Sequence, residues 1–566
     1  MKYLIVFLCF AFAKALTAQE QPVDSLIRVT AGYQTIDEAV LPDAVIYSKD
    51  NARRVVVNHR GIEMTCDRAV LYQKDNFLRA VGNVIMKQGD SITMTCNYAE
   101  YNGNTQLAFA SEKVNMITPD TRLTTDTLFF NRIKQQAYYR SGGTVRDSAS
   151  TLTSRVGRFY IQEQKYRFID NVVVTNPEYT INSNHLDFYE ENGHAFMYGP
   201  STITGKTSKV YCERGFYDTR GDTGYFVKNS RIDYNTRTIT GDSLYFSRPR
   251  NFASATNNIV VTDTINNSII KGHYAEVYRD KDSVMITKRP LAITIEQQDS
   301  VYMTANQLIV TGPKDNRFVR GYNDVRLFKT DLSGKCDSIT TRQSTGLTKM
   351  IRKPILWSGK SQMTGDSIFL QSNVKTEKLD SLRVFYNAFI IDQDSSGGFN
   401  QIKGKELTGF FKNNELDKVF LNKNVENLIY SRNDKQELIG INKGTSGTME
   451  IEFEDKAISI IAPADNSEDI LYPPKELPEN ARTLRGFNWR GDERLNTKAD
   501  LFKGKKPPVF TKIKGIPLPE LDEGFFDEDD GKLNENSVLQ NGELENRIEN
   551  QSKELQQPSG EENNGN

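Results

Sequence analysis

The stretch MTCDRAVL at residues 64–71 is the first clear copy of a pattern that decides the fold of this chain. Its shape returns as MTCNYAEY at 94–101, LTTDTLFF at 123–130, INSNHLDF at 181–188, ITGDSLYF at 239–246 and MTGDSIFL at 363–370. The small third residue serves as an anchor, and anchors fall at 66, 96, 125, 154, 183, 212, 241, 272, 305, 336, 365, 404 and 444. Thirteen copies, most of them about 29 residues apart, identify a repeat protein.

The columns of this repeat have a physical meaning. The anchor is always small, the next residue is always polar, and the residues two before and three after the anchor are mostly apolar or small. In a straight strand, columns five residues apart would lie on opposite faces, because side chains alternate. Both columns can face an interior only if the strand bends at the anchor. A small residue tolerates the close approach there, and Asp or Asn bonds local backbone groups.

Polar turns separate the strands, and the second strand of a unit often contains a Gly/Asn-rich step before Val, as at residues 82–84. Two strands and two turns in about 29 residues predict an antiparallel meander. We therefore expect residues 19–462 to form an all-β, elongated, twisted jelly-roll or solenoid of about 13 repeats with bent strands. A division of these residues into two consecutive subdomains is the alternative reading.

The two ends of the chain differ from the repeats. Residues 1–18 combine a basic start, a short apolar run and small residues, which predicts a signal peptide and an exported protein. No run of 18 apolar residues occurs elsewhere, so no membrane-spanning helix is expected. Residues 463–518 contain several prolines and predict an extended cap or docking segment. Residues 519–566 hold 14 acidic and 3 basic groups, predict a disordered tail and leave a charge of +10 on the rest.

The usual sites of chemistry are missing from the sequence. Cys66, Cys96, Cys212 and Cys336 all occupy the anchor column, which favours buried small residues over nucleophiles or metal ligands. A meander would hold Cys66 and Cys96 too far apart for a disulfide, whereas a one-turn-per-repeat helix would make them neighbours. A corner-forming role is predicted for the recurring acids Asp67, Asp126, Asp242, Asp337 and Asp366. We expect no enzyme activity, no cofactor, no metal site and no nucleic-acid partner.

One family resemblance adds to this picture. The run from Asp67 to Tyr72, followed by Ala80 to Val84, resembles the OstA-like (LptA-like) family of lipopolysaccharide-transport proteins. Residues 336–339, 353–357 and 364–366 are similar to its long Bacteroidetes-type branch. The resemblance implies a periplasmic protein, associated with the outer membrane, whose apolar groove holds the acyl chains of lipopolysaccharide. It also implies that edge strands join other jelly-roll proteins of the inner- and outer-membrane transport complexes.

The apolar columns supply the candidate groove residues. These are Met64, Met94, Leu123, Leu128, Leu152, Ile181, Leu186, Phe188, Ile239, Leu244 and Phe246. Two other readings stay open from the sequence. One is an exported β-solenoid that binds or degrades polysaccharide, and the other is an outer-membrane β-barrel with alternating strands.

Overall fold

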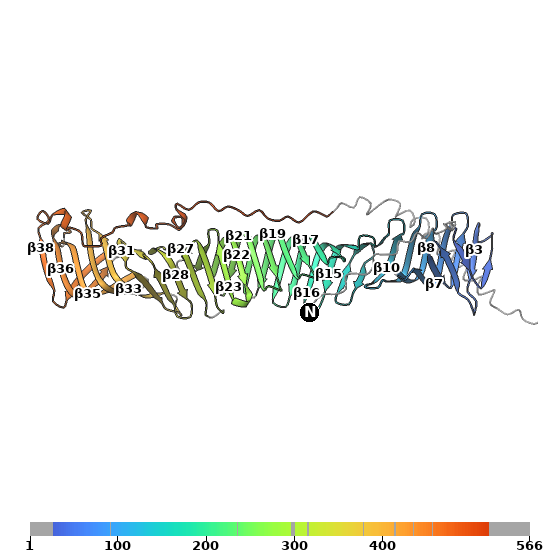
Figure 1. Cartoon of the computed structure of the whole chain (residues 1–566), viewed down its shortest axis with the longest axis horizontal. Coiled ribbons are helices and arrows are strands. Elements are labelled where there is room, and N and C mark those ends of the chain that lie inside the picture. Colours follow the sequence, from blue (N-terminus) through green and yellow to red (C-terminus); the bar gives the residue numbers. More distant parts are fainter. Residues whose placement is uncertain are drawn as a thin grey trace, which may run out of the picture. The chain divides into compact units, whose positions relative to one another are not determined.

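The computed structural model describes residues 26–519, apart from residues 91, 235, 266, 296–299, 314–315, 377, 413–414, 434 and 455–456. The expected signal peptide, and the tail from residue 520 onward, therefore lie outside the described residues. Of the described chain, residues 26–516 belong to one compact unit. This unit is nearly all β, as the repeat predicted, and its strands stack side by side along one long axis (Figure 1).

The strands follow one another without interruption. The first group is β1 (Arg28–Thr30), β2 (Tyr33–Thr35), β3 (Ala44–Ser48), β4 (Val55–His59), β5 (Ile62–Cys66), β6 (Arg68–Tyr72), β7 (Phe77–Gln88), β8 (Ile92–Asn102), β9 (Leu107–Ile117), β10 (Arg122–Asn131), β11 (Gln136–Tyr139), β12 (Gly143–Arg146), β13 (Thr151–Ser154), β14 (Val156–Tyr160), β15 (Lys165–Thr175) and β16 (Tyr179–Tyr189). The second is β17 (His194–Gly205), β18 (Ser208–Asp218), β19 (Thr223–Tyr234), β20 (Arg237–Ser247), β21 (Phe252–Asp263), β22 (Ser268–Tyr278), the short helix η1 (Arg279–Lys281), β23 (Ser283–Thr287), β24 (Leu291–Ile295), β25 (Ser300–Thr304), β26 (Gln307–Thr311) and β27 (Phe318–Lys329). The third is β28 (Leu332–Arg342), β29 (Leu347–Ile351), β30 (Ile355–Ser358), β31 (Ser361–Thr364), β32 (Ser367–Ser372), β33 (Leu379–Gln393), β34 (Phe399–Lys412), β35 (Glu415–Arg432), β36 (Leu438–Glu454), β37 (Ala457–Ala464) and β38 (Glu468–Tyr472).

Each repeat is a bent pair of antiparallel strands. The strand that carries the anchor runs through a first arm, turns a corner at the anchor and continues through a second arm. The return strand then retraces both arms. In the first clear repeat, β5 forms the first arm, β6 forms the second, and β7 pairs with both. Because every return strand also pairs with the next anchor strand, the repeats form one continuous meander.

A pair of left-handed residues makes most of the corners. In β7, Gly82 (φ +76°) and Asn83 (φ +48°) stand opposite one residue of β8, so the pairing shifts between Val81 and Val84. Equivalent pairs with positive φ occur at 112–113, 170–171, 228–229, 257–258, 288–289, 323–324, 352–353, 386–387, 423–424 and 465–466. Such a bulge inverts which side chains point inward. The predicted bend is therefore confirmed, but the left-handed backbone lies on the return strand and not on the anchor strand.

The polar residue after the anchor holds the corner from outside. Asp67 accepts a hydrogen bond of 2.7 Å from the Asn83 side-chain amide, and Asp242 accepts one of 3.0 Å from Asn258 in the equivalent place. Burial alone would raise the pKa of Asp67, but the hydrogen bonds from Asn83 and Lys49 outweigh it and lower that pKa. The corner-forming role predicted for these aspartates is thus confirmed where a partner amide is present.

The stack of repeats ends ten residues later than residue 462. Strands β37 and β38 both pair with β36, and within the described residues neither has a second neighbour. Pro463 lies inside β37, where an edge strand tolerates the missing N–H. This edge is apolar as well as unpaired, since Ile460 and Ile470 are 53% and 57% exposed.

After β38 the chain turns back along the outside of the arms as a segment that we call the strap, residues 473–516 (Figure 1). It contains the short helices η2 (Glu479–Ala481), η3 (Gly491–Glu493) and η4 (Lys498–Phe502). Near its start, the strap backbone is held by Gln401. The Gln401 amide donates to the carbonyl of Arg482, and its oxygen accepts from the N–H of Leu484, both at 2.8 Å.

Two more carboxamides hold the strap in the same way. Gln362 donates to the carbonyl of Asn488 and accepts from the N–H of Arg490, both at 2.8 Å. Far along the stack, Asn257 donates to the Thr511 carbonyl at 2.9 Å and accepts from its N–H at 3.0 Å. All three carboxamides are buried, so these bonds replace solvent for both partners.

The start of the strap also completes a second apolar layer. Leu477 and Leu484 pack with Phe389, Ile391 and Leu428, which lie on the last long strands. The outer face of these strands is therefore apolar and covered, whereas elsewhere only the inner faces form a core. Leaving this patch in water would cost roughly 25 cal/mol per Å² of apolar surface.

The corner geometry makes Gly82 sensitive to substitution. A Cβ at this position would lie 3.0 Å from an Asp67 carboxylate oxygen, on a backbone with φ +76°. We expect Gly82→Ala to lower the free energy of unfolding by about 1–2 kcal/mol. Gly61→Ala is the matched control, because Gly61 also has a positive φ (+80°) but no atom within 4 Å of the added carbon. Urea denaturation of both variants measures the difference, and equal losses would contradict a role for the Asp67 contact.

Candidate functional site: the apolar interior

The interior of the first arm is lined by one long ladder of apolar side chains. Its members lie two residues before each anchor and at the paired positions of the return strands. Each member is the direct cross-strand neighbour of the next. They are Val57, Met64, Met86, Met94, Met116, Leu123, Val145, Leu152, Val174, Ile181, Ile203, Val210, Ile232, Ile239, Val261, Ile270, Ala292 and Met303. An apolar surface thus runs unbroken through most of the unit.

Two further ladders line the second arm. The ladder nearer the corner contains Phe168, Leu186, Met197, Gly215, Phe226, Leu244, Ala255, Ala275 and Ile286 in its middle part. The ladder farther from the corner contains Phe188, Ala195, Tyr217, Gly224 and Phe246. Both face the first-arm ladder across the interior.

The structure brings all eleven sequence-predicted groove residues to this interior. Six lie on the first-arm ladder: Met64, Met94, Leu123, Leu152, Ile181 and Ile239. Leu128, Leu186 and Leu244 lie on the second-arm inner face near the corner, and Phe188 and Phe246 lie farther from it. They do not share one environment. Leu128, Leu186 and Leu244 are at most 2% exposed, whereas Leu152, Phe188, Ile239 and Phe246 are only half-buried.

The N-terminal part of the interior is closed. Met64, Met86 and Met94 of the first arm belong to the same buried cluster as Ala80 and Ala99 of the second arm. Long side chains on one wall thus match short ones on the other, and the space between the arms is filled. These residues pack as a protein core at this end of the unit.

The middle part of the interior is less completely covered toward the ends of the arms. Eight consecutive members of the first-arm ladder are only half-buried there: Ile203, Val210, Ile232, Ile239, Val261, Ile270, Ala292 and Met303. We call these eight positions the open stretch. Beside the corner, Leu244 and Ile286 remain 1% exposed. The eight side chains of the open stretch pack against the buried core but are less completely covered than the residues at the corner.

Arginines from the second arm reach across the ends of the open stretch. The guanidinium of Arg248, just after β20, lies 5.6 Å from the ring centre of Tyr179 at the start of β16. That of Arg279, just after β22, lies 5.2 Å from the ring of Tyr234 at the end of β19. Each contact joins the end of a second arm to the end of a first arm and places a cation at the mouth of the interior.

A third cross-mouth contact is an ion pair. Asp263, at the end of β21, is 2.7 Å from Arg317 at the start of β27 and 3.2 Å from Arg237 on the neighbouring strand. One buried carboxylate thus serves two guanidinium groups. Arg248 is likewise 3.7 Å from Asp222, so the guanidinium groups at the mouth lie beside carboxylates.

The cysteines take the structural role that their column predicted. Cys66, Cys96, Cys212 and Cys336 are buried free thiols, and burial raises the pKa of each to about 12. Strand β7 separates the strands of Cys66 and Cys96, which settles the topology as a meander.

The structure also bears on metal binding and on membrane-spanning helices. Across the described parts of residues 26–519, no group of three His, Cys, Asp or Glu side chains is placed to hold a metal ion. Within the same residues, no helix is both long enough and apolar enough to cross a membrane.

The fold and its interior define an elongated β-jelly-roll built from stacked repeats around an apolar core. A family model described as OstA-like protein matches residues 31–184, from just before β2 into β16. This match supports an OstA-like assignment, and the OstA-like proteins are a transport and binding family whose members are typically periplasmic. No curated protein matches the chain. The repeats after residue 184 continue the same ladders without a break, so the matched architecture extends beyond the matched residues.

The buried thiols predict both reactivity and pH dependence. In the chain from residue 19 onward, we expect no reaction with a thiol reagent at pH 8 until denaturant is added, when all four cysteines react. Each thiol has a folded pKa of about 12 against an ordinary value of 9.0. The unfolded chain therefore releases these protons first, and stability should fall as pH rises from about 9 to 12. Rapid native labelling at pH 8 would contradict this burial.

Proposed function

We propose that this protein is a periplasmic lipopolysaccharide carrier that shelters acyl chains in the open stretch and helps to deliver the lipid to the outer membrane. The observation that carries the proposal is the incomplete burial of eight consecutive apolar side chains on one inner wall. A closed β core would bury such a ladder, as it does near the N-terminus. An acyl chain lying along it would gain about 0.8 kcal/mol for each CH₂ removed from water.

The guanidinium groups at the mouth support an anionic lipid. Arg248, Arg279 and Arg317 stand where the head group of a lipid would emerge if its acyl chains lay between the arms. Guanidinium groups bind phosphate through paired hydrogen bonds. Residues 1–518 also carry a net charge of +10, which favours the approach of an anionic ligand.

The two ends of the unit support assembly with other β-proteins. At the C-terminal end, β37 and β38 expose apolar side chains beside an edge with no further strand among the described residues. At the N-terminal end, the short strands β1 and β2 each pair with one neighbour in the described part of the chain. We propose that strand addition at these edges joins the protein to jelly-roll partners in a membrane-to-membrane path.

The proposal is tested by a matched pair of substitutions on β21. Val261 faces the interior and Thr262, the next residue, faces outward. We expect Val261→Asp to abolish co-purification of lipopolysaccharide, because a carboxylate in the open stretch would be desolvated by an acyl chain. Thr262→Asp should retain the lipid. Native mass spectrometry of protein purified without detergent measures the bound lipid, and circular dichroism checks the fold.

Phe246→Arg supplies a second variant on the facing wall, because Phe246 is only half-buried. Leu186 is fully buried, so a substitution there would change the stability of the fold and would not test lipid binding. An empty wild-type protein that takes up no added lipopolysaccharide would refute the carrier function. So would equal lipid content in the Val261→Asp and Thr262→Asp variants.

A further inference from the structure

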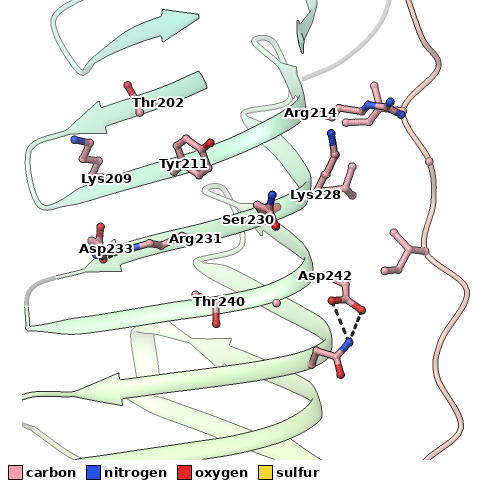
Figure 2. Close-up of a pocket in the computed structure, with 17 residues that line it drawn as sticks. Thr202, Lys209, Tyr211, Arg214, Lys228, Ser230, Arg231, Asp233, Thr240 and Asp242 are labelled. Atoms are coloured by element: carbon pink, nitrogen blue, oxygen red, sulfur yellow. Dashed lines mark hydrogen bonds and ion pairs between the residues drawn. The ribbon is translucent and has the colours of Figure 1, made fainter. Parts of the chain in front are cut away.

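A separate cavity of about 1080 Å³ lies on the outside of the first arm, between the arm and the end of the strap (Figure 2). Strands β17 to β21 contribute its floor and one side. Ile513, Gly515 and Ile516 of the strap contribute the other side. This volume lies just above the range of about 300–1,000 Å³ that is typical of small-molecule sites.

The cavity is independent of the apolar interior. Its floor contains Thr202, Tyr211, Arg231 and Thr240, which are direct cross-strand neighbours. The residues beside them in sequence, such as Ile203 and Ile232, belong to the open stretch. Because side chains alternate along a strand, the floor of the cavity and the open stretch are opposite faces of the same arm.

The charges that line the cavity are unequal. Four cations, Lys209, Arg214, Lys228 and Arg231, stand against two carboxylates, Asp233 and Asp242. Figure 2 shows Arg214 and Lys228 extending toward the strap, with Lys209 and Arg231 farther along the strands. The cavity wall therefore carries a surplus of two positive charges.

The carboxylates are already engaged inside the protein. Asp233 lies 2.9 Å from Arg231, and Asp242 accepts two hydrogen bonds from the Asn258 amide, at 3.2 and 3.0 Å. Neither Lys209 nor Arg214 forms an ion pair or hydrogen bond with a residue in the described part of the chain. Their donors are available to a ligand.

The strap wall of the cavity is apolar, because Ile513, Gly515 and Ile516 form it. Residues 503–516 contain five lysines and no acidic residue. Ile516 is only 4% exposed, which fixes the end of the strap against the arm, and Lys514 lies 5.3 Å from the ring centre of Tyr225. These lysines add positive charge near the cavity, whereas the cations that line it all belong to the arm.

We propose that this cavity binds an acidic oligosaccharide, a short glycan whose sugars carry carboxylate or phosphate groups. Lys209 and Arg214 would bind the charged groups, and the hydroxyls of Thr202, Tyr211 and Thr240 would bind the sugar hydroxyls. The length of the site, which crosses β17 to β21, suits an extended chain of sugars.

An acidic peptide fits the site less well. Strands β17 to β20 are paired on both sides, so no strand edge is open to a peptide backbone. The floor also lacks deep apolar pockets for side chains, because its outward residues are polar. A polar, cationic surface with several hydroxyls matches a glycan instead.

The test measures binding of fluorescent oligogalacturonate, about ten sugars long, to the full mature chain by anisotropy at low salt. The double variant Lys209→Ala/Arg214→Ala should bind at least about tenfold more weakly, and added salt should weaken binding of the wild type. The matched control is Lys206→Ala/Arg220→Ala, which removes the same charge from neighbouring turns outside the cavity. All four side chains are at the surface, and thermal unfolding confirms that both proteins remain folded.

Three outcomes would overturn the proposal. Equal binding of uncharged dextran would show that charge is not recognised. Equal loss in the two double variants would show a diffuse effect of net charge. Binding of millimolar inorganic phosphate with no measurable oligogalacturonate binding would reduce the cavity to a site for a small anion. Each result leaves the lipid-carrier function untouched, because that function depends on the opposite face of the arm.

Discussion

The corner between the two arms is the constraint on which the rest of this structure depends. A strand that alternates its side chains can bury only one set of them, and most of the corners invert that set by inserting two left-handed residues opposite one. Several corners use residues such as Glu112, Lys113 and Tyr386, for which positive φ costs about 1–2 kcal/mol per residue. The corner is kept because, without it, one arm would turn its apolar face to water.

Because the corner recurs in every repeat, the stacked repeats enclose one long apolar interior. Each corner aligns its side chains with those of the next repeat, so three apolar ladders run along the arms and contact across the space between them. The walls need not be equally covered everywhere. Long methionines against alanines close one end, and the half-buried aliphatic residues from Ile203 to Met303 leave the middle less completely covered. A change of side-chain size along one architecture can therefore separate a core from a lipid-binding stretch.

The strap likewise divides the outer surface into an apolar, covered part and a cationic part. Where it begins, it covers apolar side chains and builds a second core layer with Leu477 and Leu484. Where it ends, it bounds a cationic cavity and is held by single contacts such as those of Asn257 and Ile516. One segment thus stabilises the last repeats and shapes a polar site about six repeats away. The inner and outer faces of the first arm are chemically distinct as a result.

The sequence by itself determined the all-β class, the repeat, the inward columns and the bend, because each depends on residue size and polarity at a fixed spacing. It placed Met64, Leu186 and Ile239 correctly inside for the same reason. It did not reveal which of them are fully buried and which are half-buried, since that depends on how the arms pack. The path of the strap and the cavity beneath it were also decided only by the tertiary structure. Their contacts join residues as far apart as Asn257 and Thr511, and the pattern of neighbouring residues gives no information about such a pairing.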